Sequence, residues 1–232
     1  MRFLKFIIAV ILLPTVFFTL TETGSILYRV LGNWTAAAFF FVGMGLYTVI
    51  HYLLYDFSRP YVFVHEMTHA MAALLCGGRI SDISIGSESG YVKMDKTNAF
   101  VVLAPYFVPG YMLLTVFLYV AADLFIECAP YRNYFLFAIG FFMAFHLIQT
   151  FEALYTTEQP DLKLAGGKIF SMVMIVLANL LVLAVVLKGI FPEEVSLRQA
   201  GQHIVRGSIN VWRIIVNYIV EWISYAQQYA HK

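Results

Sequence analysis

Charged residues are scarce in this 232-residue sequence: Asp, Glu, Lys and Arg make up 12% of it, whereas 61% of the residues are hydrophobic. A soluble domain carries about 25% charged and about 45–50% apolar residues. A water-soluble fold of this length has too little interior to bury so much apolar surface, but a lipid bilayer removes that need. The sequence therefore predicts an integral, multi-pass membrane protein with the lipid bilayer as a partner.

The chain also lacks an excess of charge of either sign and a set of paired cysteines. Its formal net charge of +1 gives no signal for a polyanionic partner, so we expect no nucleic acid binding. The two cysteines, Cys76 and Cys128, stand at the ends of apolar segments. They suggest neither a disulfide framework nor a paired C-x-x-C metal site. No internal repeat, low-complexity tract or linker divides the chain.

Long apolar runs are abundant. A spanning helix needs about 20 predominantly apolar residues, and continuous rather than alternating runs favour helices over a barrel. The first run exceeds the length of about 7–15 residues typical of a signal-peptide core, so we interpret it as a retained span. Six spans would place the N-terminus on the membrane side opposite to the loop before the last span. The predicted spans are 3–20, 34–55, 61–76, 99–125, 134–155 and 169–191.

Two stretches depart from this pattern. In residues 77–98, isoleucines alternate with polar neighbours, turn residues follow, and Tyr91–Met94 alternates back, which predicts a β-hairpin. In the tail, apolar and aromatic side chains recur at helical spacing opposite charged ones such as Arg206 and Arg213, which predicts an amphipathic helix. Such a helix lies on the membrane, or it packs against the bundle or another subunit, and the sequence leaves both open.

The expected fold class is therefore an all-α membrane protein of about six transmembrane helices. A short β-hairpin follows the third helix, and an amphipathic helix ends the chain. Residues 1–191 form the predicted polytopic membrane domain, and residues 192–232 form the predicted C-terminal helix. Pro105 and Pro109 predict a kink in the fourth span, because proline in a helix interior removes a backbone hydrogen bond.

The residues with the most chemical character, His65-Glu66-Met67-Thr68-His69, stand inside the third apolar run. The two histidines are four residues apart, so both imidazoles project from one helix face, about 6 Å apart. That spacing allows two nitrogens to ligate one tetrahedral zinc at about 2.0–2.1 Å. Glu66 is placed beside such a metal, where it can accept a proton from a water molecule and return it to a leaving amine. A His/Glu cluster that only holds helices together is the alternative.

Zinc at such a site needs a third protein ligand and leaves a fourth position to water. A carboxylate or a histidine from a later segment is expected at the depth of the motif. Spacing alone does not choose between Asp161 and Glu152, and an isolated histidine in a span is usually a polar contact within the bundle. The candidates are Asp161, Glu152, His146 and, with less support, Asp123.

The stretch from Val62 to Ile80, in which the motif runs into two glycines, resembles the zinc helix of the site-2 protease family of intramembrane zinc metalloproteases. In that family a short β-hairpin follows, as predicted here over Ile80–Met94. The resemblance covers residues 60–95 well. It implies Zn²⁺ as the cofactor, His65 and His69 as metal ligands, Glu66 as the catalytic general base, and an aspartate from a later helix as the third ligand.

The family's aspartate usually stands in a Leu-Asp-Gly context, and this chain has no Leu-Asp-Gly. The nearest match is Pro160-Asp161-Leu162, followed by glycines at 166 and 167. The resemblance thus supports Asp161 as the third metal ligand and indicates a divergent member of the family.

These observations predict an intramembrane zinc endopeptidase that hydrolyses peptide bonds in or near the membrane spans of substrate proteins. A helix must be unwound before hydrolysis, and an edge strand of the hairpin could hold the extended segment. The alternative is a non-proteolytic zinc-binding scaffold or an accessory subunit of a membrane complex. The missing Leu-Asp-Gly and the long tail favour that alternative, and the C-terminal helix is where a homo- or hetero-oligomer could form.

Overall fold

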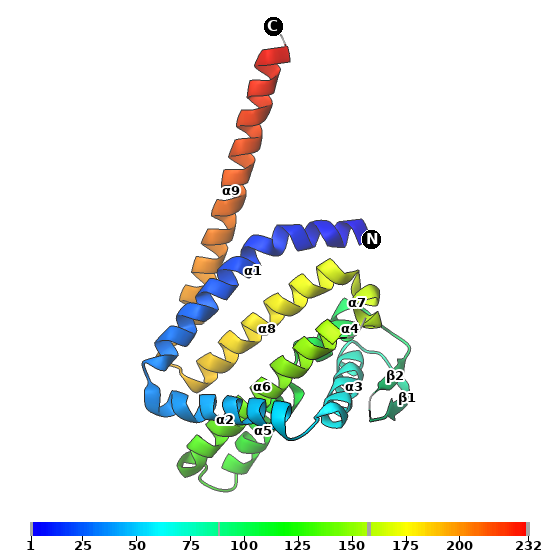
Figure 1. Cartoon of the computed structure of the whole chain (residues 1–232), viewed down its shortest axis with the longest axis vertical. Helices are drawn as coiled ribbons and strands as arrows, with labels where there is room; N and C mark the ends of the chain where they lie inside the picture. Colours follow the sequence, from blue (N-terminus) through cyan, green and yellow to red (C-terminus); the bar gives the residue numbers. More distant parts are fainter. Residues whose placement is uncertain (1, 88, 157–158, 231–232) are drawn as a thin grey trace.

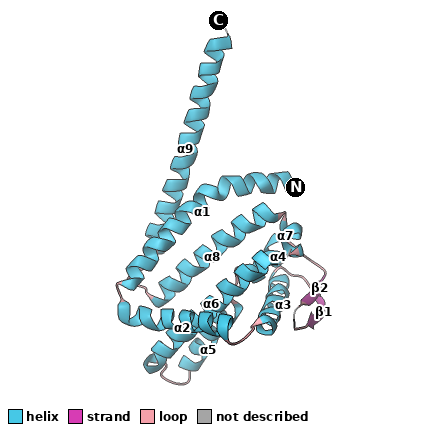
Figure 2. Ribbon diagram, in the orientation of Figure 1, coloured by secondary structure: helices cyan, strands magenta, loops and turns pink. Residues whose placement is uncertain are grey.

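Helices dominate the computed structural model, which describes residues 2–87, 89–156 and 159–230 (Figure 1, Figure 2). One two-stranded antiparallel hairpin, β1 with β2, stands beside α3. The helices are α1 (Arg2–Leu31), α2 (Trp34–Leu53), α3 (Ser58–Leu75), α4 (Ala99–Leu103), α5 (Gly110–Asp123), α6 (Arg132–Thr156), α7 (Pro160–Ala165), α8 (Lys168–Ile190) and α9 (Leu197–Ala230). The strands are β1 (Ile80–Ile85) and β2 (Gly90–Met94), and the short 3-10 helices are η1 (Ala104–Tyr106) and η2 (Ala129–Tyr131). The predicted helical class and the hairpin are confirmed.

The predicted count of six spans is not confirmed. By length and composition, α1, α6 and α8 can each cross a membrane. Two further pairs qualify only when each is taken as one span: α2 with α3, bent by 119°, and α4 and η1 with α5, bent by 79°. The described residues therefore hold three to five candidate spans. The second break falls at Pro105 and Pro109, where the sequence predicts a kink, because proline cannot donate the backbone hydrogen bond that would continue the helix.

Helices α2 and α6 pack against each other more extensively than any other pair in the described residues. Gly43 lies against the backbone of Phe137, and Gly140 lies against the backbone of Phe40. A Cβ atom at either glycine would overlap a carbonyl oxygen of the opposite helix. Small residues allow helix backbones to approach closely in membrane proteins, where dispersion contacts rather than water exclusion hold helices together.

The N-terminus of α1 lies beside α7. The Lys5 ammonium donates a hydrogen bond to the Ala165 carbonyl at 2.6 Å, and Figure 1 shows the first turns of α1 on the side of α7. The expectation that the N-terminus and the loop before α8 lie on opposite sides is therefore wrong. The physical reason is that a sharply bent helix pair need not reverse the direction of the chain as two straight spans would.

The C-terminal helix α9 is 34 residues long and packs on α1 only along its first half. His203 contacts Glu22 at 2.8 Å, and the Trp212 indole donates to the Ile11 carbonyl at 3.1 Å. From residue 213 to residue 229 the side chains are exposed, and the helix extends beyond the other elements (Figure 1). Residues 231 and 232 of the predicted tail lie outside the described part of the chain.

Candidate metal centre

Helix α3, which carries the histidine motif, begins and ends at well-defined local signals. At its start the Asp56 carboxylate accepts a hydrogen bond from the Ser58 backbone N–H at 2.8 Å. At its end Gly77 has a φ of 71° and donates to the Leu74 carbonyl, while Gly78 donates to the Ala73 carbonyl at 2.8 Å. This is the Schellman arrangement, in which a left-handed residue ends the helix. The helix therefore stops at Leu75, where the sequence predicts its end within one residue.

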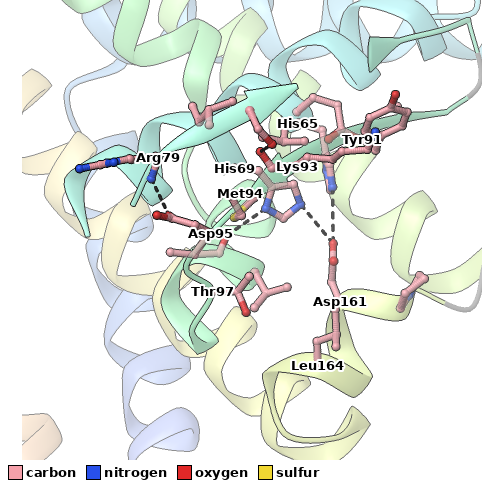
Figure 3. A pocket seen from close by; sticks show the side chains of 18 of the residues that line it. His65, His69, Arg79, Tyr91, Lys93, Met94, Asp95, Thr97, Asp161 and Leu164 are labelled. Atoms are coloured by element: carbon pink, nitrogen blue, oxygen red, sulfur yellow. Dashed lines mark hydrogen bonds and ion pairs between the residues drawn. The ribbon is translucent and has the colours of Figure 1, made fainter. Parts of the chain in front are cut away.

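Three candidate ligands meet at one point. His65 and His69 lie one turn apart on α3, and both side chains are buried. Asp161, in the first turn of α7, places its Oδ2 3.3 Å from His69 Nε2 and 3.7 Å from His65 Nε2 (Figure 3). Ligand atoms of all three residues lie within 4.8 Å of one another. Two ligands about 2.0–2.1 Å from one tetrahedral zinc are about 3.3–3.4 Å apart. The distance from Asp161 to His69 falls in this range and the distance to His65 is slightly longer, so the three residues could hold a metal ion.

Neighbouring groups orient two of the three candidate ligands, His69 and Asp161, as a metal would require. His69 Nδ1 lies 2.9 Å from the Val101 carbonyl. Because a carbonyl can only accept, Nδ1 carries the hydrogen and Nε2 keeps its lone pair for a metal. The Tyr106 hydroxyl donates to Asp161 Oδ2 at 2.9 Å. His65 Nδ1 is buried and has no hydrogen-bond partner among the described residues.

Val101 and Tyr106 were not found from the sequence. Both belong to the α4–η1 segment, which the sequence predicts only as part of an apolar span. The available signals were indirect: Asn98, whose side chain accepts from the Val101 backbone N–H at 2.9 Å and starts α4, and the break at Pro105. Neither signal identifies the residues that contact the ligands.

The other candidates for the third ligand lie elsewhere. Glu152 contacts His51 Nε2 at 3.0 Å, which joins α6 to α2. His146 contacts the Asn179 side chain at 3.0 Å, which joins α6 to α8. Asp123 accepts a hydrogen bond from a backbone N–H in the loop that follows it. Among the described residues, only Asp161 joins the two histidines in a group of three that could hold a metal.

A family model for Peptidase M50B-like proteins matches residues 34–191, which is more than half of the chain. The chain belongs to the Peptidase M50B-like family. This confirms the resemblance to site-2 proteases, a membrane-embedded family of zinc metalloproteases. The match runs from α2 through α8, so it contains His65, Glu66, His69 and Asp161, but it includes neither α1 nor α9. Comparisons with curated proteins and with solved structures found no match.

In this M50B-like chain the hairpin is in close contact with Glu66. Gly90, the first residue of β2, approaches the glutamate so closely that a Cβ atom there would lie 2.6 Å from Glu66 Cγ and 3.0 Å from Oε1. The same Cβ atom would lie 2.8 Å from the Ser84 carbonyl oxygen of β1. The sequence predicts Gly90 only as part of a turn. In the structure Gly90 also makes room for the Glu66 carboxylate, because glycine has no side chain.

Two cavities reach this M50B-like site. The larger, of about 710 Å³, is lined by the three candidate ligands and by every residue of β2 (Figure 3). The smaller, of about 470 Å³, extends toward α6 and is lined by Gln149 and Glu152. Glu66 therefore borders cavities on two sides, one toward the hairpin and one toward α6. The residues common to both cavities are His65, Glu66, Gly90, Gln159 and Pro160.

The hairpin also carries an exposed cross-strand ion pair. Asp82 on β1 accepts hydrogen bonds from the Lys93 ammonium at 3.0 Å and from the Tyr91 hydroxyl at 2.9 Å, both on β2. These hydrogen bonds, that from Lys93 first, hold the pKa of the Asp82 carboxyl below its ordinary value. The pair lies on paired residues of the two strands and supports their register.

Proposed function

We propose that this protein is an intramembrane zinc endopeptidase that hydrolyses peptide bonds in or near the membrane spans of substrate proteins. One observation carries the proposal above the others: Asp161 meets His65 and His69 while Glu66 stands beside them without joining the group. Three ligands and one adjacent carboxylate are the arrangement that catalytic zinc sites use, because the fourth position must stay open.

In this proposal His65, His69 and Asp161 hold the metal, which when bound lowers the pKa of water and polarises the peptide carbonyl. Glu66 accepts a proton from the attacking water and delivers it to the leaving amine. The Gly90 contact limits the positions open to the Glu66 carboxylate. The Val101 carbonyl keeps His69 in the tautomer that a metal ligand needs.

The hairpin is suited to hold the substrate. A transmembrane helix has all its backbone groups paired, so it must be unwound before its peptide bonds can be attacked. β2 pairs with β1 along one edge and lines the larger cavity along its whole length. An extended substrate segment can add to its other edge through main-chain hydrogen bonds, and alternate side chains would then point into the cavity.

The test is Glu66→Gln in the full chain, purified in detergent micelles and supplied with a pool of internally quenched decapeptides. We expect zinc content to stay at the wild-type level while cleavage falls by about 10²–10⁴-fold, the range for loss of a general base. Glu221→Gln on the exposed part of α9 is the matched control and should cleave normally. Equal cleavage by Glu66→Gln and wild type, or a wild-type protein that binds no zinc, would refute the proposal.

A second candidate function is a zinc-binding scaffold or an accessory subunit of a membrane complex. The observation that favours it is α9, whose apolar and aromatic side chains are exposed over residues 213–229. Such a face suits the lipid surface or another protein subunit. The two functions separate in the same assay. A scaffold would bind zinc and leave all peptides and membrane-protein substrates intact, with or without Glu66.

A further inference from the structure

The helix that carries Asp161 is too short to hold its own position. α7 has six residues, and isolated helices shorter than about 12–15 residues are marginal even in favourable sequences. Its buried face, Leu162 and Ala165, packs in the apolar cluster that contains Tyr106. That packing holds α7 against the neighbouring helices through its buried face. The place of Asp161 relative to the two histidines then depends on what holds the two ends of the helix.

The C-terminal end of α7 is held by α1. The Lys5 ammonium donates to the carbonyl of Ala165, the last residue of α7, at 2.6 Å and across 160 residues of sequence. The ammonium also lies 5.6 Å from the centre of the Phe170 ring. A helix leaves its last carbonyls without partners inside the helix, and a lysine side chain can supply one. A charged donor makes a bond about twice as strong as a neutral one.

Gly166 leaves the space that Lys5 occupies. A Cβ atom at this position would overlap the Lys5 side chain, and the φ of 140° is one that other residues rarely adopt. Gly167 follows with a φ of 108°, and its N–H donates to the Leu162 carbonyl at 2.8 Å. The two glycines therefore turn the chain sharply after α7 and leave its last carbonyl open to a donor from α1.

The two ends of α7 are close enough to move together. Asp161 and Ala165 are four residues apart, which is about 6 Å along a helix axis at about 1.5 Å per residue. Tyr106 holds the Asp161 end through its hydroxyl, and Lys5 holds the other end. Because one turn of hydrogen-bonded helix joins the two ends, a displacement at Ala165 displaces Asp161 as well.

We propose that Lys5 is a positioning residue of the metal site, which holds α7 so that Asp161 meets His65 and His69. Lys5 belongs to α1, outside the residues that match the family model, so the support comes from a helix that the match does not include. The inference rests on the proposed metal site. It does not require peptidase activity, because Lys5 acts on the place of a ligand and touches neither substrate nor metal.

The test compares Lys5→Met, which keeps the side-chain stem and loses the charged donor, with Lys5→Arg, which keeps a charged donor. Lys168→Met is the matched control. Lys168 is exposed at the start of α8, beside the same turn, and its side chain has no hydrogen bond or ion pair in the described residues. Two properties are measured on the full chain in detergent micelles: zinc affinity by competition with a chromophoric chelator, and hydrogen exchange of the α7 amides in metal-free protein.

We expect Lys5→Met to weaken zinc binding by about 10–100-fold, the effect typical of losing a group that orients a ligand, and to speed hydrogen exchange in α7. Lys5→Arg and Lys168→Met should match the wild type in both measurements. Wild-type zinc affinity in a folded Lys5→Met protein overturns the proposal. If Lys5→Met does not insert stably, the milder Lys5→Gln takes its place.

A wild-type protein that binds no zinc would refute the proposed function separately. Hydrogen exchange then decides the role of Lys5. Faster exchange of the α7 amides in Lys5→Met would support a role in holding α7, and unchanged exchange would overturn it.

Discussion

Replacing Gly90 with alanine measures how closely the hairpin constrains the proposed general base. The φ of Gly90 is not positive, so its backbone accepts alanine and the effect comes from the added methyl group alone. That methyl would stand 2.6 Å from Glu66 Cγ, whereas carbon atoms in contact are about 3.5–4.0 Å apart. The methyl would also lie 2.8 Å from the Ser84 carbonyl oxygen on the neighbouring strand, so it cannot turn away from Glu66 and β1 must shift as well. Glu66 must therefore retreat by about 1 Å.

A misplacement of about 1 Å in a catalytic group lowers the rate by about 10²-fold, which corresponds to about 2.7 kcal/mol of transition-state stabilisation. We expect Gly90→Ala to show this loss with the pool of quenched decapeptides while its zinc content stays at the wild-type level, because Glu66 lies outside the group of candidate ligands. Gly45→Ala is the control, since no atom lies within 4 Å of the position of its Cβ. Wild-type cleavage by Gly90→Ala would show that the hairpin does not constrain Glu66.

Three further outcomes are expected. Tyr106→Phe removes the hydroxyl that donates to Asp161, so chelator competition should show zinc affinity lowered by about 10–100-fold; an unchanged affinity would contradict this support. Because the pKa of the Asp82 carboxyl is lowered in the folded protein, its hydrogen bond to Lys93 stabilises the hairpin fully at pH values above its ordinary pKa of about 3.9. This stabilisation is lost as the pH falls through the pKa of the folded state. The protection factors of the β1 and β2 amides, which compare each exchange rate with the intrinsic rate at the same pH, should therefore fall on acidification in wild type but not in Asp82→Asn, and equal pH profiles would refute the link. Gly140→Ala forces a methyl group against the backbone of α2, so it should destabilise the fold by about 1–3 kcal/mol or more, measured as a lower thermal midpoint; a wild-type midpoint would mean that the helices separate easily.

The sequence by itself determined the features that depend on overall composition or on residues close together along the chain. The scarcity of charge indicates a membrane protein because it reflects the solvent of the whole chain. The four-residue spacing of His65 and His69 places both on one face of any α-helix, whatever that helix packs against. Gly77 ends α3 through its own backbone conformation, and the alternation around Tyr91 predicts the hairpin.

Only the tertiary structure decided which acid completes the group. Asp161 and Glu152 are near one another in the sequence, and both follow the motif by more than 80 residues. Their separation in space depends on how α6 and α7 pack: Glu152 meets His51 of α2, whereas the short α7 turns Asp161 toward α3. A pattern along the chain carries no information about a distance set by the packing of other helices.

The same reason explains the contacts that the sequence did not predict. Gly90 against Glu66, Tyr106 on Asp161 and Lys5 on Ala165 each join residues from separate elements. The broken helices have the same origin, because an apolar run of sufficient length is compatible with both a straight span and a bent pair. Residue type and spacing set the chemistry available on α3, and the packing of α4 and α7 beside one another brings Asp161 to the two histidines.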